Sequence, residues 1–284
     1  MKIISRQVGL TLVELMIALA VGAILILGVI QIFLSGQRSY QLQDGVGTMQ
    51  DGGRIGIFFL HEHLRMAGFP RRQQLPPGFF SPFVIADDPA VAGVQPLTRD
   101  GNDAVNEPDT VTIMYRSNTN CVGGDTSAYT NPMQDAEGFF YAKDQFLIGR
   151  SVLGDGTSAM SLRCQALDAN DQLVTAAQTA NTEAFVEGIE DMQLLYGVDR
   201  PPAGVDPDFL ADAYLNATQV TAANLWNSVV SIRFALLVTS IDNAMEDPSP
   251  IRHRLLDAPA HPAFADRLYR RVFRSTVEVR NRTP

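Results

Sequence analysis

Residues 9–34 read GLTLVELMIALAVGAILILGVIQIFL, and this stretch decides how the rest of the chain is interpreted. As a helix, residues 10–34 would span about 37 Å at ~1.5 Å per residue. The hydrocarbon core of a bilayer is only ~30 Å thick. No charged residue lies between Glu14 and Arg38, and residues 1–9 carry two positive side chains. Because positive residues favour the cytoplasmic side, the stretch predicts a membrane-spanning helix with a cytoplasmic N-terminus.

Two ordinary explanations of this stretch are less satisfactory. A secretory signal peptide has an apolar region of ~7–15 residues that ends in a small-x-small cleavage site. The run here is longer, and no such site ends it cleanly. A plain membrane anchor fits the length, but a carboxylate inside an apolar helix costs roughly 2.5–3.5 kcal/mol on insertion scales. Glu14 is therefore a candidate functional residue.

Residues 9–15, GLTLVEL, after a short basic leader, resemble the type IV prepilin signature. The resemblance implies that a prepilin peptidase removes residues 1–9 by cutting after Gly9 and then methylates the new amine of Leu10. It implies that the apolar helix stays on the mature protein. Glu14 would pair with the N-terminal amine of a subunit in the growing filament and set the register, which offsets the energy of the buried charge. Leu10 stands where the family usually has Phe.

The composition is that of a folded protein, with 46% hydrophobic and 19% charged residues. The formal net charge is −9. Removal of residues 1–9 would take away Lys2 and Arg6, leaving 20 basic against 31 acidic residues, or −11. This balance argues against general nucleic-acid binding, which relies on basic side chains that neutralise phosphates.

Residues 35–68 continue the helical pattern in amphipathic form. Four apolar side chains recur at helical spacing: Ile55, Phe59, Leu60 and Leu64. Five glycines lie between positions 45 and 56: Gly45, Gly47, Gly52, Gly53 and Gly56. Since each glycine weakens a helix by up to ~1 kcal/mol relative to Ala, we expect a break or kink around residues 44–53. The helix should end by Gly68, with Pro70 just beyond it.

The remaining residues, 69–284, predict a β-rich globular head. Residues 70–108 hold seven prolines and are expected to be mostly loop. Alternating apolar and polar residues predict four strands, at 109–116, 190–196, 228–240 and 271–280. Residues 200–227 predict an insertion with a short helix near 218–226. The fold class is therefore α+β, a long N-terminal hydrophobic helix packed on an antiparallel sheet.

Scattered pieces of the chain resemble the PilW family of minor pilins. They are Met49-Gln50, Gly53-Arg54, Phe59-Leu60, LRMAGF at 64–69, MQ at 192–193, YGVD at 196–199, YRR at 269–271 and VRN at 279–281. The resemblance implies a minor pilin that joins other minor pilins and the major pilin at the inner-membrane assembly platform. It implies a role in starting pilus assembly and a place at the pilus tip, with twitching, attachment or DNA uptake as downstream processes. In that family a Gly-Cys pair often follows the Ala-Gly-aromatic turn, whereas here Pro70 follows Phe69.

The same resemblance implies a single-pass inner-membrane protein with a periplasmic head before assembly and a surface pilus location afterwards. Two alternative functions are consistent with the same N-terminal segment. A minor pseudopilin of type II secretion would use the same helix in another machine. A pilus-tip adhesin would bind a ligand through the long loops at 70–108 and 198–227.

The chain holds two cysteines, Cys121 and Cys164. Such a pair forms one disulfide in an exported domain and is more often two free thiols in the cytosol. Because the head is expected to be periplasmic, we predict a disulfide. It would stabilise the head by about 3–4 kcal/mol in the chain-entropy model.

Other chemistry-bearing patterns are weak, so we expect no enzymatic activity, no cofactor and no metal site. His61-Glu62-His63 lacks the HExxH spacing, which would need a histidine where Arg65 stands. The stretch DGND at 100–103 departs from the EF-hand pattern at position 104. His253 and His261 have no nucleophile motif nearby. The arginines at 267, 270, 271, 274, 280 and 282 are expected on a solvated strand face, with interface salt bridges to acidic neighbours. A DNA-contacting tip is the alternative.

Overall fold

A computed structural model places most of the chain. It describes residues 11–69, 83, 98–101, 107–129, 131–135, 137–152, 154, 156, 158–170, 173–174, 182–200 and 207–279. The expected cleavage site at Gly9 and Leu10, most of the loop at 70–108, and Arg280 and Arg282 lie outside these residues.

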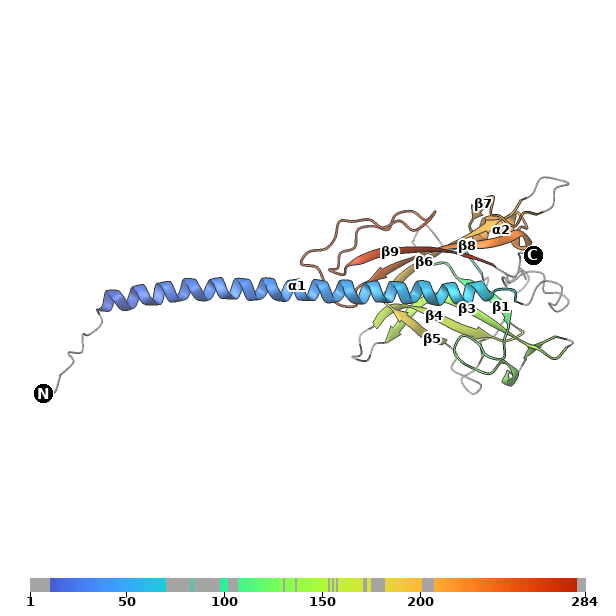
Figure 1. Ribbon diagram of the computed structural model, residues 1–284, viewed down its shortest axis with the longest axis horizontal. Coiled ribbons are helices and arrows are strands. Elements are labelled where there is room, and N and C mark those ends of the chain that lie inside the picture. The colour runs from blue at the N-terminus through green and yellow to red at the C-terminus, as the bar shows by residue number, and fades with distance from the viewer. Residues whose placement is uncertain are drawn as a thin grey trace.

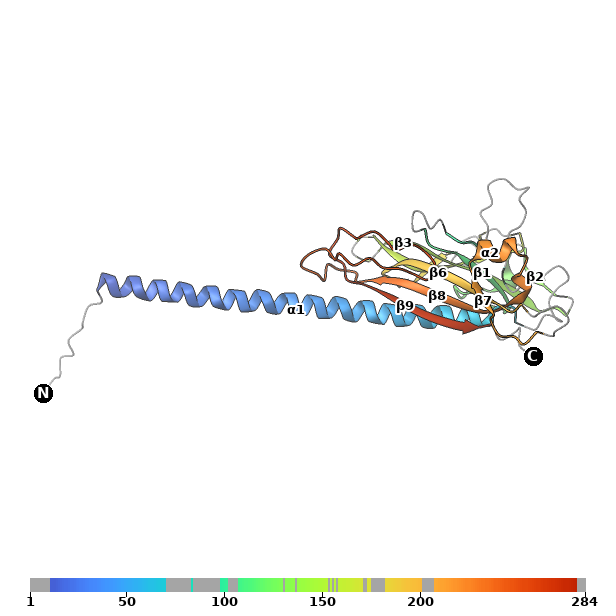
Figure 2. The same ribbon diagram turned by 90° about the horizontal axis from the view of Figure 1, so that it is seen from above.

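A single helix, α1 (Leu12–Met66), runs for 55 residues and forms the axis of the molecule. The Thr11 side chain caps its N-terminus by accepting a hydrogen bond from the Glu14 backbone N–H at 3.2 Å. The helix ends before Gly68, which has a φ of 73°. Its N-terminal half projects from the head, while its C-terminal half lies along the head (Figures 1 and 2).

The glycines of α1 do not interrupt it, contrary to the expected break or kink at 44–53. Six residues form one buried stripe at helical spacing: Gly45, Met49, Gly53, Gly56, Leu60 and Leu64. A Cβ at Gly53 would lie 2.5 Å from the ring of Phe273, and one at Gly56 would lie 2.8 Å from Cδ1 of Ile189. The glycines are therefore places where the head packs against the helix backbone.

Among the described residues, the strands of the head form two antiparallel sheets. One sheet has the order β1-β3-β4-β5, with β2 paired to β3. Its strands are β1 (Val111–Arg116), β2 (Met133–Gln134), β3 (Phe140–Val152), β4 (Ser158–Leu167) and β5 (Thr182–Glu187). The other sheet has the order β7-β6-β8-β9. Its strands are β6 (Ile189–Val198), β7 (Ala213–Leu215), β8 (Val229–Thr239) and β9 (Arg270–Glu278).

In the part of the chain that the structure describes, the short helical pieces lie in the connections. They are η3 (Thr126–Ala128), α2 (Ala217–Ala222) and η4 (Trp226–Ser228). Asn216 starts α2 with a capping box, in which its side chain accepts from the Gln219 N–H at 2.9 Å. The expected short helix near 218–226 corresponds to α2 and η4.

The chain passes from one sheet to the other at Gly188, between β5 and β6. Its φ is 75°, and a Cβ there would lie 2.7 Å from the carbonyl oxygen of Thr239. The Gly188 N–H donates to Met160 of one sheet at 2.8 Å, and its carbonyl accepts from Thr239 of the other at 2.7 Å. Only glycine combines this backbone angle with so close an approach.

Helix α1 lies between the two sheets and contacts β8 and β9 of one and β5 of the other (Figure 1). Leu60 and Leu64 are fully buried and share one core with Phe146 of the first sheet and Leu236 of the second. The segment 240–269 covers the outer face of the second sheet, where Leu255 packs on Leu237 and its neighbours. The α+β fold of a long N-terminal helix and an antiparallel head is confirmed, with two sheets where one was expected.

Candidate functional site: the apolar helix and the disulfide of the head

The N-terminal half of α1 exposes its apolar side chains. Leu12 is 75% exposed and Ile24 is 69% exposed. Among the described residues, α1 is the one helix long and apolar enough to cross a membrane. A surface of this size requires lipid or other apolar helices to cover it, because soluble monomers rarely expose such patches.

Glu14 lies in the first turn of α1 and is exposed. A carboxylate at this position interacts favourably with the positive end of the helix macrodipole. The Thr11 cap fixes the first turn, since Thr11 also accepts the Leu15 N–H through its carbonyl oxygen at 3.2 Å. The carboxylate is thus held at the start of the apolar helix, three residues after the cap.

Cys121 and Cys164 form a disulfide, as expected from the sequence. Their Cα atoms are 6.4 Å apart, and 43 positions separate them in the chain. Cys164 is fully buried in β4, while Cys121 lies in the loop that follows β1. The bond therefore fastens this loop to the first sheet.

Hydrogen bonds hold the loop around Cys121 in place. The Asn120 side chain accepts from the N–H groups of Val122 at 3.0 Å and Gly124 at 2.7 Å. It also donates to the Tyr129 hydroxyl at 2.7 Å. The loop is accordingly an ordered part of the head rather than a flexible connection.

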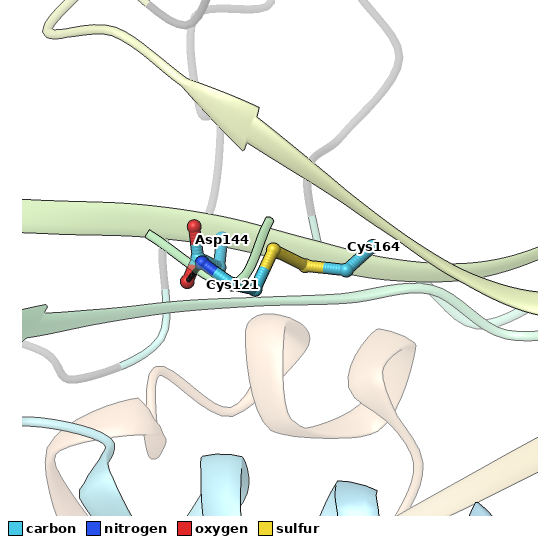
Figure 3. Close-up of side chains that lie close together, drawn as sticks. All are labelled: Cys121, Asp144 and Cys164. Carbon is cyan, nitrogen blue, oxygen red and sulfur yellow. Dashed lines mark hydrogen bonds between the residues drawn. A yellow bond between two sulfur atoms is a disulfide. The ribbon is translucent and has the colours of Figure 1, made fainter. Parts of the chain in front are cut away.

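Asp144 of β3 lies beside the disulfide (Figure 3). Its Oδ2 accepts from the Tyr115 hydroxyl at 2.6 Å and from the Cys121 backbone N–H at 2.9 Å. Burial raises the pKa of Asp144 to about 7, although both hydrogen bonds act to lower it. Asp144 could not be predicted as a site residue from the sequence, because a lone aspartate in an unpredicted strand carries no motif.

The two histidines at 61 and 63 lie near the C-terminal end of α1, on either side of Glu62. His63 packs against Phe59 and Phe146, with ring centroids at 4.3 and 5.3 Å. Its Nδ1 lies 2.8 Å from the Phe59 carbonyl oxygen, and burial lowers its pKa. His63 is therefore partly buried in the head rather than exposed on a solvated helix surface.

Among the described residues, one group of three potential ligands is close enough to share an ion: Cys121, Asp144 and Cys164. Its two sulfurs are joined in the disulfide. In the other candidate, at 100–103, Gly101 donates its N–H to Asp109 at 2.7 Å. Positions 102 and 103 lie outside the described residues.

His261 and Arg270 fasten the segment 240–269 to the second sheet. His261 Nε2 lies 2.7 Å from Asp191 Oδ2, and both residues are buried. Arg270 binds Glu190 at 2.6 Å and also Asp266, and its hydrogen bonds lower the pKa of Asp266. Arg270 is thus buried in an ion-pair network rather than solvated, whereas Arg271 and Arg274 are exposed. His261 is therefore a structural residue that holds the segment 240–269 on the second sheet.

Comparison with known proteins gives matches at both ends of the chain. Residues 4–30 match the prokaryotic N-terminal methylation motif, and residues 145–281 match type IV pilus-assembly protein W, the PilW family. A solved type IV-like pilin from Thermus thermophilus aligns at 11% identity with a TM-score of 0.42. That alignment covers 83% of this chain and 97% of the other. No curated protein matches the sequence.

The methylation motif and the long apolar helix that carries it define the class, a type IV pilin-like protein. The PilW match begins in β3 and runs past β9, so it covers most of the two-sheet head. Together the two matches support the assignment of this chain as a minor pilin of the PilW type. The family is one of structural subunits.

Proposed function

We propose that this chain takes part in initiating type IV pilus assembly, as a member of a minor-pilin complex at the pilus tip. A prepilin peptidase cuts after Gly9 and methylates the amine of Leu10. The mature protein waits as a single-pass inner-membrane protein with its head in the periplasm. It then leaves the bilayer with other minor pilins and the major pilin, at the inner-membrane assembly platform.

The observation that carries this proposal is the exposed apolar half of α1 on a helix without a break. In the bilayer, lipid covers this surface. In a filament, the same surface is covered by the helices of neighbouring subunits. The transfer requires no unfolding, because the helix satisfies its own backbone hydrogen bonds in both surroundings.

Glu14 supplies the register in this mechanism. An isolated carboxylate in an apolar environment is unfavourable, and a partner amine at hydrogen-bond distance offsets much of that energy. In a subunit that is shifted by one position along the filament axis, Glu14 would lack that amine. The pairing therefore selects one helix offset among several that apolar packing alone would tolerate.

The type II secretion alternative uses the same helix, so the test compares the two machines. In a strain that lacks this chain, we expect few or no surface pili and normal secretion of exoproteins. The wild-type chain should restore piliation, and the Glu14→Gln variant should restore much less. Glu62→Gln, an exposed substitution in the head half of α1, serves as the matched control and should restore piliation fully. Normal piliation with lost secretion would contradict the proposal.

A further inference from the structure

The carboxyl group of Asp144 and the disulfide form one buried cluster in the head (Figure 3). One carboxylate oxygen and the two sulfurs all lie within 4.8 Å of one another. Oδ2 has two hydrogen-bond donors, Tyr115 and the Cys121 N–H. Oδ1 is buried and has no hydrogen-bond partner among the described residues. A buried carboxylate oxygen without a donor is unfavourable, and a proton on the carboxyl group relieves it.

The two sulfurs differ in access. Cys164 is fully buried in β4 and belongs to the main core, whereas Cys121 is only partly buried in its loop. A thiol from solution therefore reaches the Cys121 sulfur first, and the sulfur of Cys164 is the one that leaves. A thiolate at Cys164 would form in an apolar environment, which raises the pKa of a thiol. This sulfur consequently needs a proton at the moment when the bond opens.

Asp144 is suited to supply that proton. The ionisable groups that face it are the hydroxyls of Tyr115 and Tyr129, and burial raises the pKa of Tyr129 to about 12 and that of Tyr115 further. The neighbouring Lys143 points to the opposite face of β3 by strand alternation. On α1, the ionisable side chain of His63 packs on Phe146 of this strand. Asp144 combines a carboxylate oxygen within 4.8 Å of both sulfurs with a pKa of about 7.

We propose that Asp144 is the proton-exchanging group of the Cys121–Cys164 disulfide. On opening, an external thiolate attacks Cys121 Sγ, the S–S bond breaks, and Cys164 leaves as a thiolate that takes the proton of the Asp144 carboxyl group. On closing, the Asp144 carboxylate removes the Cys164 proton. The resulting thiolate attacks Cys121 Sγ in a mixed disulfide with an external thiol–disulfide oxidant, whose own thiolate is released. This inference rests on the disulfide and is independent of the role in pilus assembly.

The test follows the opening of the disulfide in the folded, full-length protein in detergent. Dithiothreitol opens the bond, and alkylation followed by mass measurement counts the free thiols. Each rate is divided by the dithiothreitol thiolate concentration, between about pH 6 and 9. For the wild type, the normalised rate should fall as pH rises through about 7, because the fraction of protonated Asp144 falls. In Asp144→Asn, which keeps an oxygen for both donors, it should be independent of pH. The same falling profile in both proteins would overturn the proposal.

Two further variants separate the chemistry from global stability. Asp109→Asn removes another buried carboxyl group, one that bonds to the N–H groups of Gly101 and Leu194 instead, and it should keep the wild-type profile. Equal loss of the pH dependence in both aspartate variants would overturn the proposal. Tyr115→Phe removes a hydrogen bond that lowers the pKa of Asp144. Its profile should shift to higher pH, and an unshifted profile would contradict the inference even if Asp144→Asn failed to fold.

Discussion

At the scale of single residues, two buried aspartates stand out in the head. Asp109 accepts hydrogen bonds from the N–H groups of Gly101 and Leu194, both at 2.7 Å, and so ties the start of β1 to β6 of the other sheet. Burial raises the pKa of Asp109 to about 8, and that of Asp144 to about 7. Each aspartate therefore joins two parts of the head. Each also keeps its proton at pH values well above the usual pKa of an aspartate.

These pKa values predict how stability depends on pH. A carboxyl group with a raised pKa keeps its proton in the folded state over a range where the unfolded state has lost it. The free energy of unfolding should therefore fall as pH rises from about 4 to about 8, by at most ~1.4 kcal/mol per pH unit for each group. His63 acts in the opposite direction, because its lowered pKa favours folding as pH rises.

The contribution of Asp109 is isolated by comparing wild type with Asp109→Asn. Denaturant unfolding of the full-length protein in detergent, repeated at several pH values, gives both curves. The difference in stability between the two proteins should shift in favour of the variant as pH rises towards 8, since the variant has no carboxyl group to deprotonate. Two parallel curves would show that Asp109 does not hold a proton in the folded state.

At the scale of elements, the glycines of α1 show that packing against the head can override a low local helix propensity. Their low helix propensity predicted a kink, and the helix is continuous. The reason is long-range: Gly53 contacts Phe273 and Gly56 contacts Ile189, residues more than a hundred positions away in the chain. Propensity read along the chain could not show that the head closes on these positions.

Two glycines of α1 provide a matched pair of substitutions. A side chain at Gly56 would meet Ile189 and Leu236, whereas a Cβ at Gly47 would meet nothing within 4 Å. Gly56→Leu should destabilise the head by about 1–3 kcal/mol through overpacking. Gly47→Leu should stabilise it by about 0.5–1 kcal/mol through helix propensity. Thermal unfolding of both variants measures the difference, and equal effects would contradict the packing described for α1.

The strands likewise differ in whether the sequence pattern alone predicts them. The four predicted strands correspond to β1, β6, β8 and β9, because apolar and polar residues alternate in their sequences. Strands β3, β4 and β5 of the first sheet were not predicted from the sequence. In β3, Lys143, Asp144 and Gln145 are all buried, so polar residues interrupt the alternation on both faces. Covered polar side chains of this kind look like loop residues when only the sequence is considered.

The candidate site was likewise predictable in part. The apolar run, Glu14 and the pairing of two cysteines in an exported head follow from residue types alone. The place of Asp144 depends on strand register, because Cys164 pairs with Phe146 and Tyr115 pairs with Ala142. Register of this kind is fixed by the folded sheet, so no sequence motif could have brought residues 115, 121, 144 and 164 together.

At the scale of the whole molecule, the segment 240–269 is attached to the second sheet and also contacts α1. Its buried attachment is the network of Arg270, Glu190 and Asp266. Its contact with the helix includes an ion pair of Arg38 with Glu246 at 2.9 Å, where the two side chains are 62% and 64% exposed. Buried and exposed ion pairs differ in what their removal costs, so the two attachments should differ in importance.

Substitution of the two arginines tests this difference. Arg270→Met leaves Glu190 and Asp266 without their partner and should destabilise the head by about 2 kcal/mol, reduced from the fully buried case because both carboxylates are partly exposed. Arg38→Met should change stability by less than about 0.5 kcal/mol. Denaturant unfolding compares them. A larger effect at Arg38 would show that the exposed pair, rather than the buried network, holds the segment.

The proposed assembly role requires the helix to stay on the mature protein after removal of a short leader. The most direct measurement is the intact mass and N-terminal sequence of the membrane-extracted protein, from cells with and without the prepilin peptidase. When the peptidase is present, cleavage after Gly9 and methylation of Leu10 should give a protein that starts at Leu10, with a mass about 14 Da above the unmodified value for a single methyl group. Without the peptidase, this product should be missing. A start at Met1 in both strains, or a cut beyond Leu34, would contradict the proposed assembly role.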